Sequence, residues 1–122
     1  MGRVKENKER EERIEMEIVV DAYNEEERAM GWYYYLENRM RFPFTARSVA
    51  ERGISPLKKG EVLEVVGMAP EEHCEKEMFV EIRWRDRTLG VPLSQLKGIE
   101  VDDGTQQAMD DWCYWIDRGY EF

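Results

Sequence analysis

The segment that most constrains the fold spans residues 79–96, FVEIRWRDRTLGVPLSQL. From Val80 to Trp84 apolar and charged side chains alternate, which is the period-two pattern of a half-buried strand. A charged break at residues 85–87 precedes a second extended run, in which Pro92 indicates an edge strand because proline cannot donate a ladder hydrogen bond. A hairpin by itself is marginally stable in water, so these two predicted strands must pack on other parts of the chain.

Length and composition predict one folded domain covering residues 1–122, large enough for a single core without disulfides. Apolar residues make up 42% of the chain, which argues against a disordered protein. The 27 acidic and 18 basic residues give a formal net charge of −9. This charge disfavours nucleic acid or an anionic membrane as partner, because both would be repelled. Cations or a basic protein surface fit the sign, although acidic charge also serves solubility alone.

The N-terminal segment and the cysteines bear on the compartment. The first dozen residues contain no apolar run, so we expect neither a signal peptide nor a transmembrane segment. Cys74 and Cys113 are the two cysteines, too few for a disulfide scaffold or a cysteine-built zinc site. A reduced, cytoplasmic setting is therefore the default expectation.

The order of predicted elements indicates an α+β fold. Residues 1–12 are charged throughout and predict a frayed or helical N-terminal extension, and residues 14–41 predict two helices. Residues 44–101 alternate short extended runs with Pro/Gly turns and end in a predicted strand at 99–101. Residues 105–118 predict a final helix. The strand spacing predicts a small SH3-like β-barrel of about five strands, flanked by two N-terminal helices and one C-terminal helix, an analogy that carries no function by itself.

Particular residues mark the predicted helices. Asn24 precedes three glutamates and predicts the N-cap of the second helix. Gly31 costs about 1 kcal/mol in a helix interior, so we expect close packing to explain it. Thr105 predicts the N-cap of the last helix, and Gly119 the residue beyond its end. Residues 14–18 fit a helix by one apolar stripe and a strand by alternation, so both alternatives stand.

The inventory of reactive side chains argues against an enzyme. His73 is the one histidine, and a hydrolytic triad, a multi-histidine zinc site or a His-activated cysteine each needs a precise set of partners that this inventory can hardly supply. The glycines are isolated, with no Gly-rich phosphate loop. His73 beside Cys74 predicts an exposed loop pair rather than a metal site.

Oxygen-rich clusters are the feature that points to a ligand. Calcium takes about six to eight oxygen ligands from flexible segments, which suits acidic loops and helix ends. The EF-hand pattern is missing, so a calcium site must be assembled from separate segments, and a solvated acidic face is the alternative. The clusters are Asp21 with Asn24, Glu25 and Glu26; Glu37 with Asn38; Glu71 with Glu72 and Glu75; and Asp102 with Asp103.

Four runs cover most of the chain and carry a family resemblance: AMGWYYYLENRMRFPFTAR, ISPLKKGEVLEVVGMAPEE, EMFVEIRWRDRTLGVPLSQLKGIEVD and TQQAMDDWCYWIDRGY. The chain resembles the bacterial CcbP-type calcium-binding family. The resemblance implies a small acidic cytoplasmic protein that binds calcium without EF-hands and buffers or senses the free ion. Carried over by position, it implies metal ligands at Glu37, Asn38, Glu71, Glu72, Asp102 and Asp103.

Departures from the family pattern affect this expectation. An acidic residue often stands in the family where Asn38 and His73 stand here. Both departures remove ligand charge and imply weaker calcium binding, because affinity follows charge count and rigidity.

A protein-interaction module without a functional metal is the rival hypothesis. An SH3-like barrel with Trp84 and Trp32 predicts an aromatic groove for a peptide, although aromatic residues at helical spacing usually belong to the core. The leading hypothesis has calcium ions as partners, leaves a regulatory protein partner open, and expects a monomer with neither nucleic acid nor membrane bound.

Overall fold

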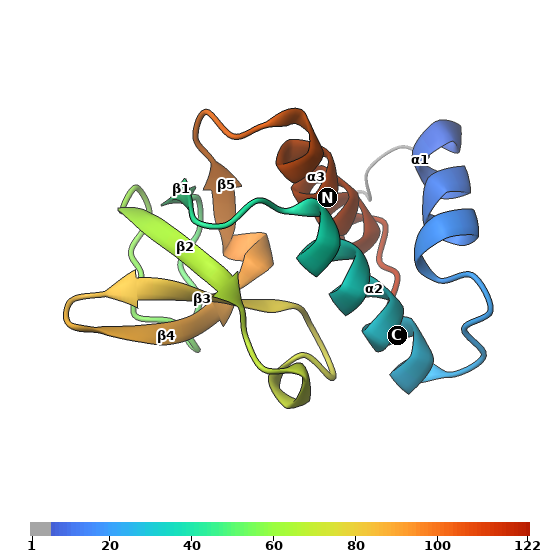
Figure 1. The fold of residues 1–122 in the computed structure, drawn as a ribbon, viewed down its shortest axis with the longest axis horizontal. Helices are drawn as coiled ribbons and strands as arrows, with labels where there is room; N and C mark the ends of the chain where they lie inside the picture. Colours follow the sequence, from blue (N-terminus) through green and yellow to red (C-terminus); the bar gives the residue numbers. More distant parts are fainter. Residues whose placement is uncertain (1–5) are drawn as a thin grey trace.

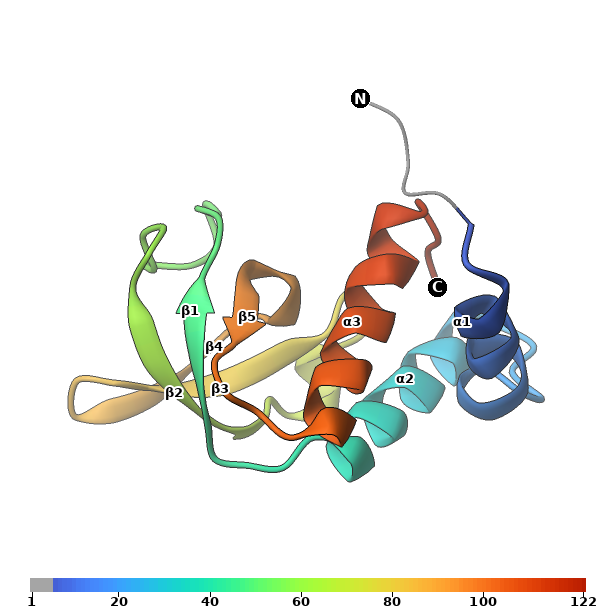
Figure 2. The same ribbon diagram turned by 90° about the horizontal axis from the view of Figure 1, so that it is seen from above.

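The computed structural model describes residues 6–122. Helices gather on one side of the molecule and strands on the other (Figure 1), and the view from above shows the same separation (Figure 2). The helices are α1 (Lys8–Arg13), α2 (Glu25–Arg39) and α3 (Asp103–Asp117), and a π-helical turn η1 (Ile14–Ile18) follows α1. The strands are β1 (Phe44–Ser48), β2 (Val62–Met68), β3 (Phe79–Trp84), β4 (Arg87–Pro92) and β5 (Leu96–Gly98). No helix within the described residues is both long and apolar enough to cross a bilayer.

The strands form one antiparallel sheet in the order β4-β3-β2-β1-β5. The predicted hairpin is confirmed as β3 and β4, with Val80 opposite Val91. Pro92 lies on β4, an edge strand, as its missing N–H predicts. The α+β class and the five strands therefore follow the sequence pattern.

The sheet is open, so the predicted closed barrel is wrong. Strands β4 and β5 are the two edges, and they do not pair within the described chain. A short 3₁₀ turn, η3 (Leu93–Gln95), joins them, and β5 is three residues long and pairs with β1 alone. The last strand thus lies before the predicted 99–101, where Glu100 has a positive φ of 51° as the chain turns toward α3. The SH3-like label stays a prediction.

Helix ends follow from caps. Asn24 is the N-cap of α2, as predicted, and its Oδ1 accepts the Glu27 N–H at 2.8 Å. Gly119 follows α3 with a φ of 85°, as expected beyond a helix end. The N-cap of α3 is Asp102 rather than the predicted Thr105, which is buried and accepts the Arg41 N–H at 2.8 Å.

The segment 14–18 is helical, which decides between the two alternatives left by its pattern. Ile14 and Ile18 are both buried, one turn apart, while Met16 between them is 63% exposed. Gly31 on α2 packs against this turn, because a Cβ there would lie 2.3 Å from the Ile18 carbonyl oxygen. The close packing expected at Gly31 is confirmed.

A cluster of aromatic rings between α2 and α3 forms the centre of the helical half. Trp32 is fully buried. Ring centroids lie 6.0, 5.1 and 5.5 Å from that of Trp32 for Tyr35, Trp112 and Trp115 respectively. Buried aromatic pairs in such tilted or edge-on geometry add to the stability that area burial supplies.

A buried carboxylate joins the three helices. Asp111 on α3 is fully buried and accepts hydrogen bonds from Arg10 at 2.6 Å and from Arg13 at 2.7 and 3.0 Å. The Tyr35 hydroxyl of α2 donates to the same carboxylate at 2.6 Å. The hydrogen bonds to Asp111 raise the pKa of the Arg13 guanidinium. Because α1 buries no side chain of its own, these charged contacts and the following η1 hold it in place.

In the described part of the N-terminal extension expected at residues 1–12, the chain follows the helical alternative. Residues 1–5 lie outside the described residues. From Lys8 the chain is a helix, capped by Asn7 and docked on α3. The charge pattern of the segment could not predict this docking, because Asp111, the partner of Arg10 and Arg13, lies about a hundred positions away in the sequence.

Gly31→Ala should destabilise the protein by about 1–3 kcal/mol despite the better helix propensity of alanine, because the new methyl group has no room beside the Ile18 carbonyl. Urea denaturation measures the difference. Gly53→Ala is the matched control, since a Cβ there meets nothing within 4 Å, and it should change stability by less than about 0.5 kcal/mol. Equal effects of the two variants would contradict this account of Gly31.

Asp111→Asn should lower the free energy of unfolding by about 2–4 kcal/mol, because two arginines lose their buried counter-ion. Thermal and urea unfolding of the full chain measure this loss. Asp110→Asn, one position away on the exposed surface, should stay within about 0.5 kcal/mol of the wild type. A small effect at Asp111 would mean that the three helices are held by apolar packing alone.

Candidate metal-binding site

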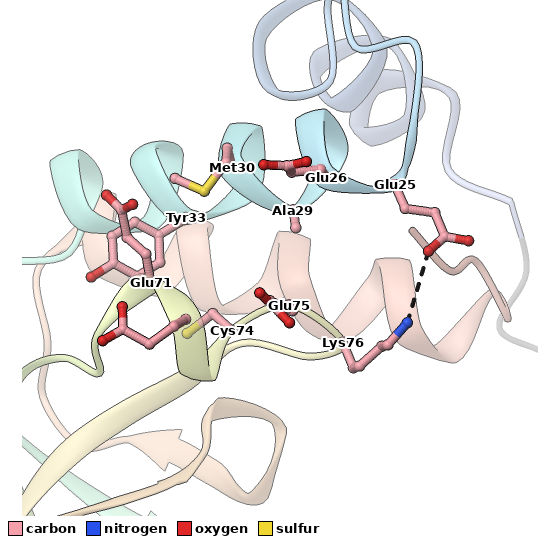
Figure 3. Close-up of a pocket in the computed structure, with 10 residues that line it drawn as sticks. Glu25, Glu26, Ala29, Met30, Tyr33, Glu71, Cys74, Glu75 and Lys76 are labelled. Atoms are coloured by element: carbon pink, nitrogen blue, oxygen red, sulfur yellow. Dashed lines mark ion pairs between the residues drawn. The ribbon is translucent and has the colours of Figure 1, made fainter.

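A cavity of about 480 Å³ lies between α2 and the loop that follows β2. Figure 3 shows its two walls, the helix above and the loop below. The lining residues are Glu25, Glu26, Ala29, Met30, Tyr33, Glu71, Glu72, Cys74, Glu75 and Lys76. Five of these ten residues are glutamates and one is a lysine, so we call this cavity the acidic pocket.

The first wall is the N-terminal half of α2. The Asn24 cap starts the helix and places Glu25 and Glu26 in its first turn. Carboxylates there are favoured by the helix dipole, which accounts for their presence without any ligand. The same turn faces the loop, so the pocket gains two carboxylates at little cost to the fold.

The second wall is the loop 69–76, which contains the 3₁₀ turn η2 (Glu71–His73). The buried Tyr33 hydroxyl of α2 donates to the Ala69 carbonyl at 2.7 Å and anchors the start of the loop. Farther along, Phe79 N–H donates to the Cys74 sulfur at 3.3 Å. These contacts fix the loop backbone while its glutamates remain exposed.

Cys74 corrects one expectation. The sequence predicted an exposed His73–Cys74 pair, but Cys74 is 2% exposed and His73 alone is on the surface. Burial raises the pKa of the Cys74 thiol, which keeps it neutral. A neutral thiol is a poor metal ligand, which leaves the carboxylate oxygens as the candidate donors of the acidic pocket.

Two side-chain contacts tie the loop to α2 across the acidic pocket. The Tyr34 hydroxyl donates to Glu71 Oε1 at 3.0 Å. At the other end of the loop, Lys76 Nζ lies 3.8 Å from Glu25 Oε2, the ion pair drawn dashed in Figure 3. Both contacts are at the surface and use carboxylates that a cation would compete for.

The negative charge of this region contributes to the raised pKa of two tyrosines of α2, Tyr33 and Tyr34. The pKa of Tyr33 is raised to about 12, mainly by burial, with smaller contributions from the nearby charges of Glu37 and Glu71. The hydrogen bond from Tyr34 to Glu71 raises the Tyr34 pKa as well. Glu37, although it does not line the acidic pocket, thus acts on the same two tyrosines.

The structure brings together part of the predicted ligand set. Glu71 and Glu72 line the acidic pocket. Glu37 and Asn38 are exposed near the end of α2 and do not line it. Asp102 and Asp103 lie at the start of α3 and do not line the acidic pocket either.

The first aspartate of that pair already has a structural role. Asp102 Oδ1 accepts the Thr105 N–H, and Oδ2 lies 3.9 Å from Arg41. The hydrogen bond with Thr105 lowers the pKa of Asp102. The carboxylate is therefore charged because it caps the helix, independently of any ion.

The sequence placed Glu25, Glu26 and Glu75 in oxygen-rich clusters, but the predicted ligand set did not include them. Glu25 and Glu26 were explained as a helix start, which is correct, but this explanation does not reveal that they also line the acidic pocket. The available signal was that an acidic helix start and an acidic loop occur in one small domain, where the fold can bring them face to face.

The donor chemistry suits a hard cation, but the side chains stand apart. Among residues 6–122 no three Asp, Glu, His or Cys side chains are grouped closely enough to hold a metal ion. Figure 3 shows the carboxylates distributed around the pocket rather than converging on one point. Glutamate side chains at the surface rotate freely, and calcium accepts flexible, irregular ligand sets. Calcium binding here would therefore require several of these glutamate side chains to rotate toward a common point.

Fold and site together define a class of protein. A small α+β domain presents carboxylates from two separate segments around an open pocket. This arrangement is typical of a cation-binding protein.

Comparison with known proteins identifies the family. The model of the CcbP family, described as calcium binding, matches residues 12–116, and the chain belongs to this family. The fold closely resembles the crystal structure of Anabaena CcbP, with 45% sequence identity, full coverage of both chains and a TM-score of 0.89. It also resembles a calcium-binding protein in its calcium-binding form, with 44% identity, 95% of each chain covered and a TM-score of 0.85. No curated protein matches the chain.

Tyr33→Phe should flatten the loss of stability at high pH. Below pH 10 the tyrosine is neutral in both the folded and the unfolded chain. Between about pH 10 and the folded-state pKa of about 12 the unfolded chain ionises first, so stability falls as pH rises. Without this hydroxyl the slope of unfolding free energy against pH should be shallower by up to about 1.4 kcal/mol per pH unit.

Urea denaturation from pH 8 to 11.5 measures both slopes. Tyr23→Phe removes a hydroxyl from a side chain that is 82% exposed, and this control should follow the wild type. Parallel profiles for Tyr33→Phe and wild type would show that Tyr33 ionises equally in both states.

Proposed function

We propose that this protein binds calcium reversibly in the acidic pocket between α2 and the loop 69–76. The observation that carries the proposal is the pocket itself, with five glutamates from two separate segments, in a member of a calcium-binding family. A relative with 44% identity is described in its calcium-binding form. The absence of an EF-hand pattern is consistent with a site assembled from distant segments.

In this proposal the ligands are carboxylates from both walls. Glu25 and Glu26 come from α2, and Glu71, Glu72 and Glu75 come from the loop. Calcium supplies two positive charges to a group of like charges that repel one another. Binding to the folded chain alone then stabilises the fold by an amount that rises with the logarithm of the calcium concentration above the dissociation constant.

Two further places remain proposals as ligand sites. Glu37 and Asn38 follow the pocket along α2, and Asp102 and Asp103 lie at the start of α3. The Asp102 carboxylate already caps a helix and faces Arg41, which makes it the weaker candidate. Glu37 is the stronger candidate, because its charge acts on Tyr33 and Tyr34 beside the pocket.

The setting and role also belong to the proposal. We expect a cytoplasmic, monomeric, non-enzymatic protein that buffers or senses calcium, with a regulatory protein partner in the case of a sensor. The rival interaction module loses support because Trp32, one of its two proposed groove residues, is fully buried. Trp84 is half-buried, and the guanidinium of Arg85 lies over its ring.

Glu26→Gln combined with Glu72→Gln should weaken calcium binding about tenfold or more, because it removes one carboxylate from each wall of the acidic pocket. Isothermal titration calorimetry measures the affinity. Two charge-altered variants locate the site: Glu37→Gln with Asn38→Ala, and Asp102→Asn with Asp103→Asn, which keeps a capping side chain.

The result that supports the acidic pocket is a large loss for the Glu26/Glu72 variant and a small loss for the Asp102/Asp103 variant. The reverse order would move the calcium site to the start of α3. Thermal melts provide the ion control: calcium should raise the melting temperature more than equimolar magnesium, with chelator as baseline. Indifference to both ions would overturn calcium binding and favour the interaction module.

A further inference from the structure

We infer that Lys76 is a built-in competitor of the calcium ion and that its ammonium group limits how tightly the acidic pocket holds calcium. The inference rests on the proposed function and adds how that site is regulated. It assigns Lys76 an affinity-setting role rather than a ligand role.

The charge pattern of the acidic pocket singles out this residue. Among the ten lining residues, all within the described chain, Lys76 alone is positively charged. Its Nζ lies 3.8 Å from Glu25 Oε2, and it comes from the loop while Glu25 comes from α2. Figure 3 shows the pair bridging the two walls at one end of the pocket. The ammonium therefore sits where a cation would interact with both walls.

The contact is loose, which allows replacement. Side-chain exposure is 87% for Lys76 and 71% for Glu25, and the separation is longer than in the Arg52–Glu77 pair at 2.9 Å. A solvated ion pair of this kind is weak and is screened by salt. A divalent ion bound by the glutamates repels the ammonium, so Lys76 must leave Glu25 when calcium enters.

A structural role for Lys76 is the alternative, and it would make the stability of the calcium-free protein depend on this side chain. An exposed side chain with one loose contact contributes little to stability. Removing the ammonium should thus leave the melting temperature in chelator within about 2 °C of the wild type. Its effect should be seen in calcium affinity and in the dependence of that affinity on salt.

Lys76→Met tests the inference by calcium calorimetry on the full chain. We expect the dissociation constant to fall about threefold to fivefold at roughly 20 mM salt and less than about twofold at 0.5 M. Lys76→Arg keeps the charge and should retain the wild-type affinity. Lys59→Met is the matched control: this exposed lysine precedes β2, whereas Lys76 follows its other end, so its charge is farther from the pocket and should change the calcium affinity less.

A double-mutant cycle with Glu25→Gln separates the specific pair from net charge. The gain from Lys76→Met should shrink when Glu25 is neutral, because the competing contact is already gone. Equal calcium affinities of Lys76→Met and Lys59→Met would overturn the inference about Lys76. The proposed function would still stand in that case, provided that the wild type binds calcium. A wild type that binds no calcium overturns both.

Discussion

The buried carboxylate of Asp111 is the contact on which the helical half depends. It accepts hydrogen bonds from Arg10 and Arg13 of the N-terminal segment and from Tyr35 of α2, so one group on α3 orients both other helices. A buried charge is tolerated only when its partners are in place, which makes the arrangement specific. Because α2 also provides one wall of the acidic pocket, the geometry of that pocket depends on a carboxylate that does not line it.

Local signals in the sequence predicted much of the fold. The hairpin at residues 79–96 followed from side-chain alternation, and the Asn24 cap from a residue type that satisfies free N–H groups. Long-range features could not be predicted in this way. The sheet is open because β4 and β5 lie at its opposite edges and do not pair with each other. Thr105 is not the N-cap, because the Asp102 side chain accepts the N–H that a cap would accept, and the Thr105 hydroxyl accepts the Arg41 N–H instead.

The site shows the same limit more strongly. The family resemblance predicted Glu71 and Glu72 as ligands, and in the structure both line the acidic pocket. Their counterparts across the pocket, Glu25 and Glu26, are explained locally as the first turn of a capped helix, and the sequence does not show that this cluster faces the acidic loop. Only the packing of the loop on α2, anchored by the Tyr33 hydroxyl, places the two acidic segments face to face.

An unclosed sheet has a further consequence, because its outermost strands keep backbone groups that could accept another chain. The longer of these margins is β4, six residues from Arg87 to Pro92. A charged arginine stands at one end and a proline without N–H at the other, and the opposite margin, β5, is only three residues long. Both margins thus carry features that discourage intermolecular strand pairing.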